Sequence, residues 1–546
     1  MSKHPPLEFQ SRRSSVFGRR GMVASSQPLA TAAGLEILRR GGNAADAAVA
    51  TAAALNVTEP TSTGIGGDMF ALFYDAKNRQ VSALNGSGRA PAGLTRERIL
   101  REGFSSALPP YHPHTVTVPG ACAGWCDLLE RYGTLSLTEV LAPAISLAEG
   151  GFPVAPTTAH FWQAGANRQL KTAPNGHELT IDGRGPNPGE IFRNPGLART
   201  LRVVAEGGKK AFYEGEIADA IADVLQKAGG AMTADDLAWH VSTWEDPASV
   251  TFGDYHIHEC PPNGQGLTAL LAFNLLEGFD LASMEPLSTE RLHLQIEALR
   301  LAFADARWYI SDPQFSNIPL AELLSKEYAS ARRKLIDPKR AVLDQKRGTP
   351  VASSDTVYFC VVDEVGNACS FINSNYMGFG TGIVPKGWGF TLQNRGHNFS
   401  LDPDHPNRLE PNKRPYHTII PGLITRADGS LFGPFGVMGG FMQPQGHLQV
   451  GLGLLVDGLD PQSVLDLPRF CIDVDSGEQG GAVLLEEGIP WRTAAELAAL
   501  GHPVRPVSGW GRATFGRGQI ILRDSASGTL TGGSDPRADG LAMTFL

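Results

Sequence analysis

The sequence predicts an α+β fold in which two antiparallel β-sheets stack on each other and are covered by helices. Helical patterns fill much of the first part of the chain, and the segment 289–310 is strongly amphipathic. Short apolar strands at 357–362 and 368–373 then follow each other across a tight turn, which indicates a hairpin and antiparallel pairing. Alternating helices and strands would also fit a doubly wound sheet, but hairpins with helices before and after them favour the sandwich.

The first helices can be predicted from the signals at their ends. One begins near Pro28 and is stopped by Gly41-Gly42. Asn43 is suited to cap the next helix, 44–55, because its side chain can accept hydrogen bonds from the N–H groups of the first turn. That second helix is rich in alanine and apolar on nearly every face, so we expect it to be buried.

The later elements follow from periodicity and from turn residues. We predict a glycine-rich loop at 61–68, strands at 69–74, 417–425, 431–437 and 517–523, and helices at 118–150 with a break at Gly133, at 445–457 and at 492–500. The polar segment 340–354 has no clear periodicity and is predicted to be an exposed linker.

Charge and hydropathy exclude some classes of function. The net charge is −9, from 47 Lys and Arg against 56 Asp and Glu, and this acidity argues against a nucleic-acid surface. No run of 18 apolar residues occurs, so no segment is predicted to span a membrane. The arginine pairs Arg12-Arg13 and Arg19-Arg20 lie too close together to enclose the apolar core of a secretory signal. We therefore expect residues 1–20 to be a basic mobile arm of a cytoplasmic protein.

A threonine stands where the polar linker meets the strand that follows it. A threonine hydroxyl is a weak nucleophile, but Thr356 would gain a base of its own if the bond after Asp355 were cut, because its free α-amine could then take the hydroxyl proton. The reference pKa of such an amine, about 7.7–8.0, leaves part of it neutral at physiological pH. On these residues alone, a threonine that merely begins a strand is the ordinary alternative.

Four stretches, in order along the chain, resemble the γ-glutamyltransferases, which are N-terminal nucleophile hydrolases. They are "GGNAADAAVATAAALNVTEPTSTGIGGDMF" at 41–70, "DTVYFCVVDEVGNACSFINSNYMGFGTGIV" from Asp355, "PNKRPYHTIIPGLI" at 411–424 and "GVMGGFMQPQGHLQ" at 436–449. In that family the nucleophilic threonine lies seven residues before the aspartate of a "VVD..GN" turn, a position that Thr356 occupies before Asp363.

The resemblance implies a four-layer αββα sandwich and self-cleavage before Thr356. Residues 21–355 would form a large subunit that ends in the 340–355 linker, and residues 356–546 a small catalytic subunit. The two fragments of one precursor would stay together as a heterodimer, with further dimerisation left open. No cofactor and no metal are implied, and the partners are a small amide substrate and a water or amine acceptor.

Site residues carry over where the motifs match. Thr356 matches the nucleophile, and Ser374 falls where the family has a second threonine whose hydroxyl hydrogen-bonds it. Gly439 and Gly440 match the pair of backbone N–H groups that stabilises the oxyanion of the tetrahedral intermediate. Asn375, next to Ser374, is included among the substrate-binding residues.

The sequence departs from the family where the γ-glutamyl group is bound. The arginine that clamps the α-carboxylate is replaced by Ser87, with an arginine two residues later at Arg89. Asn398 replaces the aspartate that holds the α-amine. His417 and Thr418 replace a pair of serines, and Arg395 replaces a glutamine. The candidate substrate-binding residues are thus Arg89, Asn375, Arg395, Asn398, His417 and Thr418. Arg89, Arg395 and His417 could gather around an anion, or they could serve ion pairs and packing.

Three functions remain compatible with these residues. The first is an autoprocessing threonine amidohydrolase of the glutathione hydrolase type, which cleaves a γ-glutamyl or similar small acyl amide and transfers the acyl group to water or an amine. The second uses the same chemistry on another small anionic amide, such as oxamate or a glutaryl amide. The third, of a different class, is an uncleaved binding protein on the same scaffold, and the intact set of catalytic residues argues against it.

Metal-type residues are present but sparse. His256 and His258 share one strand face without a third ligand nearby, and His293 and Glu297 lie one turn apart on the amphipathic helix. Packing is the better interpretation of both pairs. The six cysteines form no CxxC pair and are predicted to be free thiols.

Overall fold

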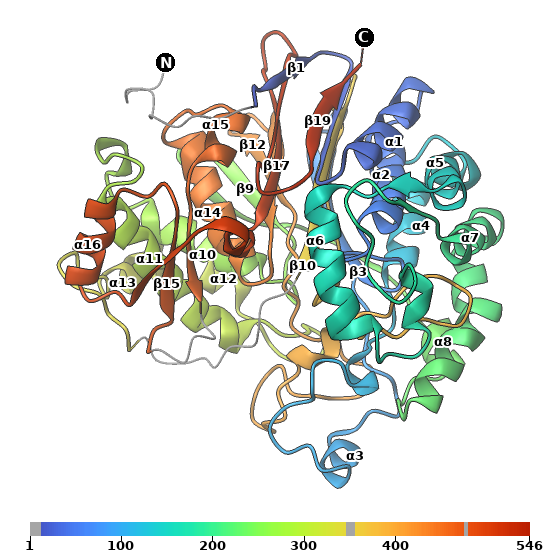
Figure 1. Cartoon of the computed structure of the whole chain (residues 1–546). Helices are drawn as coiled ribbons and strands as arrows, with labels where there is room; N and C mark the ends of the chain where they lie inside the picture. The colour runs from blue at the N-terminus through green and yellow to red at the C-terminus, as the bar shows by residue number, and fades with distance from the viewer. Residues whose placement is uncertain (1–12, 345–354, 474–478, 546) are drawn as a thin grey trace.

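The computed structural model describes residues 13–344, 355–473 and 479–545; of Asp355 it describes the backbone. Two seven-stranded sheets form the centre of the molecule, and every strand pairing within them is antiparallel. Helices cover the outer face of each sheet (Figure 1). The predicted four-layer sandwich is therefore confirmed.

The two sheets can be followed strand by strand. The first has the order β19-β2-β10-β11-β3-β4-β7, with β19 Leu541–Thr544, β2 Gly21–Ser25, β10 Asp355–Asp363, β11 Ala368–Tyr376, β3 Asp68–Asp75, β4 Gln80–Gly86 and β7 Thr243–Glu245. The second has the order β1-β18-β17-β13-β12-β9-β8, with β1 Val16–Gly18, β18 Leu530–Ser534, β17 Arg517–Arg523, β13 Leu431–Met438, β12 Gly422–Arg426, β9 Tyr255–Glu259 and β8 Ala248–Phe252. Smaller pairings join β5 Phe152–Pro153 to β6 Ile191–Phe192, and β14 Phe470–Asp473, β15 Ala482–Glu486 and β16 Val504–Val507.

Helices of the first part of the chain cover the first sheet. The layer consists of α1 Pro28–Arg39, α2 Ala44–Thr58, α4 Ala121–Tyr132 and α5 Leu137–Gly150, on which α7 Pro195–Tyr213, α8 Glu216–Lys227 and α9 Ala234–Ala238 pack. The same part of the chain also forms α6 Pro156–Gly165 and α3 Arg96–Arg101, which lies at the lower end of the molecule in Figure 1. Asn43 caps α2 through a capping box with Asp46, as the sequence predicted, and every residue of α2 is buried.

The second sheet is covered from the other side. Its helices are α10 Gly266–Leu276, α11 Thr289–Tyr309, α14 Met442–Leu455 and α15 Pro461–Asp466, with α12 Leu320–Leu323, α13 Lys326–Arg333 and α16 Trp491–Ala499 beyond them. Among the described residues, none of the helices is both long enough and apolar enough to cross a membrane.

Strand β10 shows how the layers are filled. Its residues alternate between two apolar clusters: Tyr358 and Cys360 lie between the sheets, whereas Val357 and Phe359 face the helices of the first layer. A strand buried on both faces reads as a continuous apolar run, which is why this segment was recognisable in the sequence. The interior packing holds the Thr356 end of β10 in place.

Both sheets mix strands from either side of the predicted cleavage bond. The first sheet takes β2, β3, β4 and β7 from before residue 356 and β10, β11 and β19 from after it. The second takes β1, β8 and β9 from before and β12, β13, β17 and β18 from after. Separating the two fragments would therefore break ladder hydrogen bonds in each sheet.

Three boundaries differ from the prediction, each for a local reason. Strand β12 begins only at Gly422, and 417–421 is irregular because its side chains turn to the candidate site. Helix α14 begins at Met442, three residues early, directly after the glycine pair. Part of the arm expected over 1–20 forms β1, which pairs with β18; residues 1–12 lie outside the described part. Most of the predicted linker 340–354 also lies outside it.

Candidate active site

Thr356 lies at the start of β10 and is fully buried. Its Oγ1 is 3.1 Å from Oγ of Ser374 on the neighbouring strand β11. The register between the two strands shifts beside Thr356, and Tyr376 has a positive φ of 78° there. This bulge places Ser374 beside the nucleophile candidate, as a bulge re-aims side chains in other sheets. The hydroxyl pair predicted from the sequence is therefore formed.

Arg395 extends the hydroxyl pair into a larger network. Its Nη2 donates to Oγ of Ser374 at 3.3 Å, and its Nη1 donates to Oγ1 of Thr418 at 2.6 Å. The guanidinium lies over the ring of Tyr376, 4.2 Å from the centroid. Of the predicted substrate residues, Arg395 thus lies two hydrogen bonds from Oγ1 of Thr356, and Thr418 lies three.

The charge of Arg395 is poorly compensated. Its side chain is completely buried, yet within the described residues no carboxylate comes within ion-pair distance of it, and its Nε has no partner. Burial lowers the pKa of Arg395 to about 10, with Asp68 as the main opposing charge. A buried cation without a paired anion is unfavourable, so the site is suited to take up an anionic group.

Asp68 and His417 form a buried pair beside this network. Nε2 of His417 lies 3.0 Å from Oδ2 of Asp68, and Oδ1 of Asp68 accepts from the backbone N–H of Gly88. Burial raises the pKa of Asp68 to about 7, and burial together with Arg395 lowers the pKa of His417 well below 6.5. His417 is therefore neutral at physiological pH, and it does not add the positive charge that the sequence suggested.

The glycine pair sits between β13 and α14. Gly439 and Gly440 have φ angles of 135° and 59°, a region that glycine adopts without strain. Across the described residues, neither backbone N–H has a hydrogen-bond acceptor. The carbonyl of Gly440 is held by Nε2 of Gln265, which also donates to the carbonyl of Thr418. Two fixed, unused N–H donors are what an oxyanion site requires.

Gln443 was missed in the sequence. It lies in the first turn of α14, is fully buried, and places Nε2 3.5 Å from Oγ1 of Thr356. Its Oε1 accepts from the backbone N–H of Ile420 at 2.9 Å. The only available signal was its position three residues after the glycine pair, because that pair had to lie near the nucleophile for the predicted chemistry.

Two of the predicted substrate residues have other contacts. Nδ2 of Asn375 donates to Oγ1 of Thr391, and its side chain packs against the glycine-rich loop at Gly64 and Gly67. Asn398 accepts a hydrogen bond from the hydroxyl of Tyr376 at 2.6 Å. Asn398 thus adjoins the Arg395 network through Tyr376, whereas Asn375 braces the loop that leads to Asp68.

Arg89 lies apart from the network. Its Nη1 donates to the carbonyl of Val241 at 3.4 Å, and the same carbonyl accepts from Arg414. Within the described part of the chain no hydrogen bond or ion pair joins Arg89 to Thr356 or Arg395. The arginine that the structure brings to Thr356, through Ser374, is therefore Arg395.

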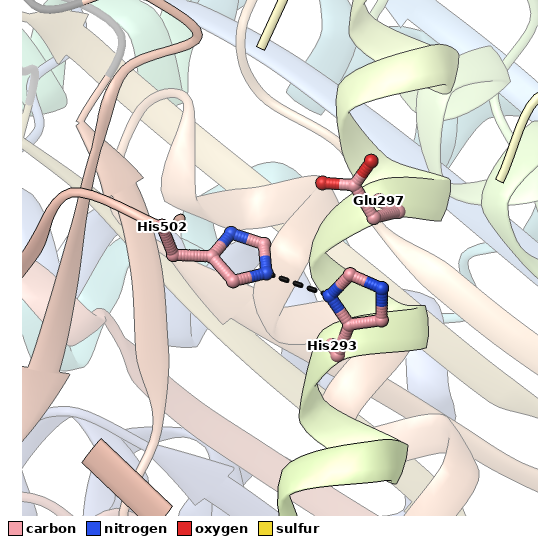
Figure 2. Close-up of side chains that lie close together, drawn as sticks. All are labelled: His293, Glu297 and His502. Carbon is pink, nitrogen blue, oxygen red and sulfur yellow. Dashed lines mark hydrogen bonds between the residues drawn. The ribbon is translucent and has the colours of Figure 1, made fainter. Parts of the chain in front are cut away.

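A separate cluster of metal-type side chains lies between α11 and the segment after α16. His293 and Glu297 project from α11 toward His502, and Nδ1 of His293 is 2.7 Å from Nε2 of His502 (Figure 2). The sequence had paired His293 with Glu297 but gave no hint of His502. These three side chains could in principle hold a metal ion.

The hydrogen bonds around this cluster argue against a metal. Arg300 can only donate, so Nδ1 of His502 accepts and its Nε2 carries the proton of the neutral ring. That proton goes to Nδ1 of His293, whose Nε2 then donates to the carbonyl of Asp337. Both oxygens of Glu297 are also occupied, by Arg300 and by the N–H of Val342. Each atom that could bind a metal ion therefore already has a hydrogen-bond partner within the protein.

Comparison with known proteins settles the family. The profile described as "Gamma-glutamyltranspeptidase" matches residues 30–545. The chain belongs to the γ-glutamyltranspeptidase family. It is accordingly an autoprocessing amidohydrolase of the N-terminal nucleophile type, as the sequence motifs predicted.

Relatives within the γ-glutamyltranspeptidase family carry several names. The chain is 38% identical to "Glutathione hydrolase-like YwrD proenzyme" of Bacillus subtilis (strain 168), over 97% of this chain and 99% of that protein. It is 32% identical to "Oxamate amidohydrolase proenzyme" of Klebsiella pneumoniae subsp. pneumoniae, over 97% and 100%. The solved structure of a cephalosporin acylase from Bacillus halodurans aligns over 100% of both chains, with 46% identity and a TM-score of 0.91.

Proposed function

We propose that Thr356 is the nucleophile of this enzyme and that the precursor cuts itself between Asp355 and Thr356. The support is geometric: the hydroxyl of Thr356 is buried, fixed at the end of a strand, and within hydrogen-bond distance of Ser374. Gly439 and Gly440 hold their unused N–H groups on the loop next to Gln443, which contacts the same hydroxyl.

Cleavage would proceed through an ester. Oγ1 of Thr356 attacks the carbonyl carbon of Asp355, the C–N bond breaks, and the nitrogen of Thr356 takes the proton. Water then hydrolyses the ester, which releases the carboxylate of Asp355 and restores the threonine hydroxyl. Residues 21–355 become the large fragment and 356–546 the small one.

Turnover would use the amine that cleavage creates. The α-amine of Thr356 accepts the hydroxyl proton as Oγ1 attacks the substrate amide, and the N–H groups of Gly439 and Gly440 stabilise the oxyanion. The amine then protonates the leaving nitrogen, and an acyl-enzyme ester remains. Water, or an amine in a transfer reaction, attacks this ester with the same amine as base and releases the acyl product.

The substrate that the site supports best is a small amide whose acyl group carries a carboxylate. This substrate class is supported by Arg395, whose buried guanidinium has no ion-paired carboxylate among the described residues. Because Arg395 reaches Ser374, which touches Thr356, the carboxylate would bind close to the reacting carbonyl. This closeness favours a short acyl group, as in oxamate, over a longer glutaryl group.

A γ-glutamyl amide is the second candidate, favoured by the family match. It also carries a carboxylate for Arg395, but in addition it carries an α-ammonium. The residue in the family's ammonium-binding position is the uncharged Asn398, which already accepts a hydrogen bond from Tyr376. An ammonium group in this pocket would therefore lose hydration without gaining a carboxylate partner.

The heterodimer and its cellular location are part of the proposal. Each sheet combines strands from both fragments, which supports a lasting association after cleavage. We place the enzyme in the cytoplasm and leave a contribution to glutathione metabolism dependent on the substrate; cell fractionation and activity on glutathione test these two points.

Mass analysis of purified protein under denaturing conditions tests the central claim. Since 355 of the 546 residues of a 58.2 kDa chain precede the bond, the wild type should give fragments of about 38 and 20 kDa, the smaller beginning Thr-Val-Tyr-Phe. Thr356→Ala should remain one inactive chain. A cleaved Thr356→Ala protein, or a different new N-terminus, would refute the assignment.

The substrate claim needs a separate panel on the cleaved enzyme. We expect kcat/KM to be highest for oxamate or other short amides with a carboxylate, lower for glutaramate, and lowest for γ-glutamyl amides. A preference for γ-glutamyl amides would favour the second candidate. Equal activity on uncharged acetamide would rule out an anion subsite.

A further inference from the structure

The amide side chain of Gln443 has a fixed orientation. Its Oε1 lies 2.9 Å from the backbone nitrogen of Ile420, and a backbone N–H can only donate. The oxygen must therefore face Ile420, so the NH₂ group must face Thr356. This resolves the usual ambiguity between the oxygen and nitrogen of a glutamine amide.

The NH₂ group can only donate, and the atom in front of it is the reacting one. Nε2 lies 3.5 Å from Oγ1 of Thr356, and no other acceptor for Nε2 is found in the described residues. The residue is completely buried, so water does not compete for this donor. A buried amide donor left with one long contact gains from any increase of negative charge on the oxygen that it faces.

The backbone around Gln443 fixes the donor relative to the oxyanion loop. Its own N–H donates to the carbonyl of Gly440 at 3.1 Å, and the N–H of Met442 donates to the carbonyl of Gly439. These hydrogen bonds tie the glycine pair to the first turn of α14, which carries Gln443. Any shift that moved Gln443 from Thr356 would also move the glycine N–H groups.

We propose that Gln443 is a catalytic residue whose side-chain N–H stabilises the developing alkoxide of Thr356, both in self-cleavage and in substrate turnover. This inference rests on Thr356 as the nucleophile. As the α-amine, or in the precursor another base, takes the hydroxyl proton, the contact to Nε2 becomes a charge-assisted hydrogen bond. No atom of Gln443 is consumed: it donates the same N–H before, during and after proton transfer.

Gln443→Met is the main test, because it removes the N–H donor without adding a charge, whereas Gln443→Glu keeps the shape of the side chain and the acceptor for Ile420 but puts a carboxyl group in front of Thr356. In Gln443→Met we expect self-cleavage and kcat of the cleaved enzyme to fall about 10- to 100-fold, the usual range for a hydrogen bond to a charged group, with KM little changed. Gln443→Glu should show at least the same loss when its carboxyl group is ionised, because it then places a negative charge beside the developing alkoxide. The rate at which a small uncharged sulfonyl fluoride sulfonylates Oγ1 of Thr356, with loss of fluoride, should fall in parallel, since it reports on the nucleophile without a substrate carboxylate.

Gln445 provides a matched control two residues along the same helix. It is equally buried, but its amide bonds to backbone: Oε1 accepts from the N–H of Ile472, and Nε2 donates to the carbonyl of Phe441. Gln445→Met should lower the melting temperature and leave kcat per active site near the wild-type value. The Gln443 variants should instead lower kcat per active site by more than any change in melting temperature explains.

Either of two results would overturn the proposal. Wild-type rates of cleavage and turnover in Gln443→Met would show that the N–H donor makes no contribution. If kcat per active site in the Gln443 variants stayed near the wild-type value and only the melting temperature fell, as expected for Gln445→Met, Gln443 would be a structural residue. Failure of the nucleophile assignment is a distinct outcome, since Thr356→Ala would then still be cut.

Discussion

Two buried polar clusters in this molecule look alike in composition and differ in how their hydrogen bonds are completed. Around His293, every ring nitrogen of the two histidines and both oxygens of Glu297 have a partner in the protein. Around Thr356, Nε of Arg395, Nδ1 of His417 and the N–H groups of the glycine pair have none in the described part. The first cluster is closed, and the second is open.

This difference in hydrogen bonding shows which of the two clusters can bind a ligand. Buried polar groups are normally hydrogen-bonded, and each one that is not needs an explanation. In the closed cluster no ligand atom of His293, Glu297 or His502 remains for a metal ion, although the residue types are those of a metal site. The unpaired buried group beside them in the described part of the chain is Nη2 of Arg300, a donor that cannot bind a cation. In the open cluster an incoming carboxylate and a developing oxyanion would complete the missing bonds. Completeness of hydrogen bonding, rather than residue type, separates the two.

The largest expected effect comes from breaking the closed cluster. In the uncut Thr356→Ala background, Arg300→Leu leaves Glu297 buried without its cation, which typically costs about 3–5 kcal/mol of unfolding free energy. Urea unfolding measures this. Arg340→Leu, which removes an exposed ion pair to Asp337, is the control and should change the unfolding free energy by less than about 1 kcal/mol. Equal effects of the two substitutions would mean that the cluster is not the tight unit described.

The same kind of substitution in the open cluster should act on binding instead. Arg395→Leu removes a buried cation that lacks an ion-pair partner, so stability should hold or rise, whereas binding of a substrate carboxylate should weaken by about 2–5 kcal/mol. Steady-state kinetics of the cleaved enzyme would show this as a raised KM. Arg89→Ala, at the carbonyl of Val241, should leave KM nearly unchanged. A larger effect at Arg89 would move the anion subsite there.

The Asp68–His417 pair gives a pH test of the open cluster. The raised pKa of Asp68 makes the folded state keep a proton that the unfolded state loses above pH 3.8, so this group alone makes stability fall as pH rises to about 7. The lowered pKa of His417 acts in the opposite sense up to pH 6.5. The two contributions should cancel in the wild type between about pH 4 and 6.5, because each state then holds one proton on the pair.

Single substitutions should uncover each contribution. His417→Gln should make stability fall by about 1.4 kcal/mol per pH unit as pH rises through this window, and Asp68→Asn should make it rise. Urea unfolding at pH 4.5, 5.5 and 6.5, again in the Thr356→Ala background, measures both slopes. If the slope of stability against pH had the same sign in both variants, the folded and unfolded states would not each hold one proton on the Asp68–His417 pair.

The smallest expected effect concerns specificity. Asn398→Asp would add a carboxylate next to Tyr376, at the position where the family holds the substrate ammonium. The ratio of kcat/KM for γ-glutamyl over oxamate substrates should rise about tenfold, which corresponds to roughly 1.4 kcal/mol. Asn375→Asp, on the loop side of β11, serves as the control and should leave the ratio unchanged. A drop in the ratio would place the ammonium elsewhere.

Local patterns explain why much of the fold was predictable. The capping signal of Asn43, the apolar run of β10 and the turn before β11 are short-range features, and each formed as expected. The same holds for Thr356 and Ser374, because adjacent strands of one hairpin bring them together. Strand β12 and helix α14 were misjudged at their starts, where contacts with the site override periodicity.

By itself, the sequence determined the sandwich, the family and the candidate nucleophile, since each motif and each hairpin spans no more than a few tens of consecutive residues. Only the tertiary structure decided that Arg395 and not Arg89 joins Thr356 through Ser374, that His417 is a neutral partner of Asp68, and that Gln443 faces Thr356. The physical reason is distance along the chain. Asp68 and His417 are 349 residues apart and Thr356 and Gln443 are 87 apart, so burial and hydrogen bonding between them arise only when the sheets close.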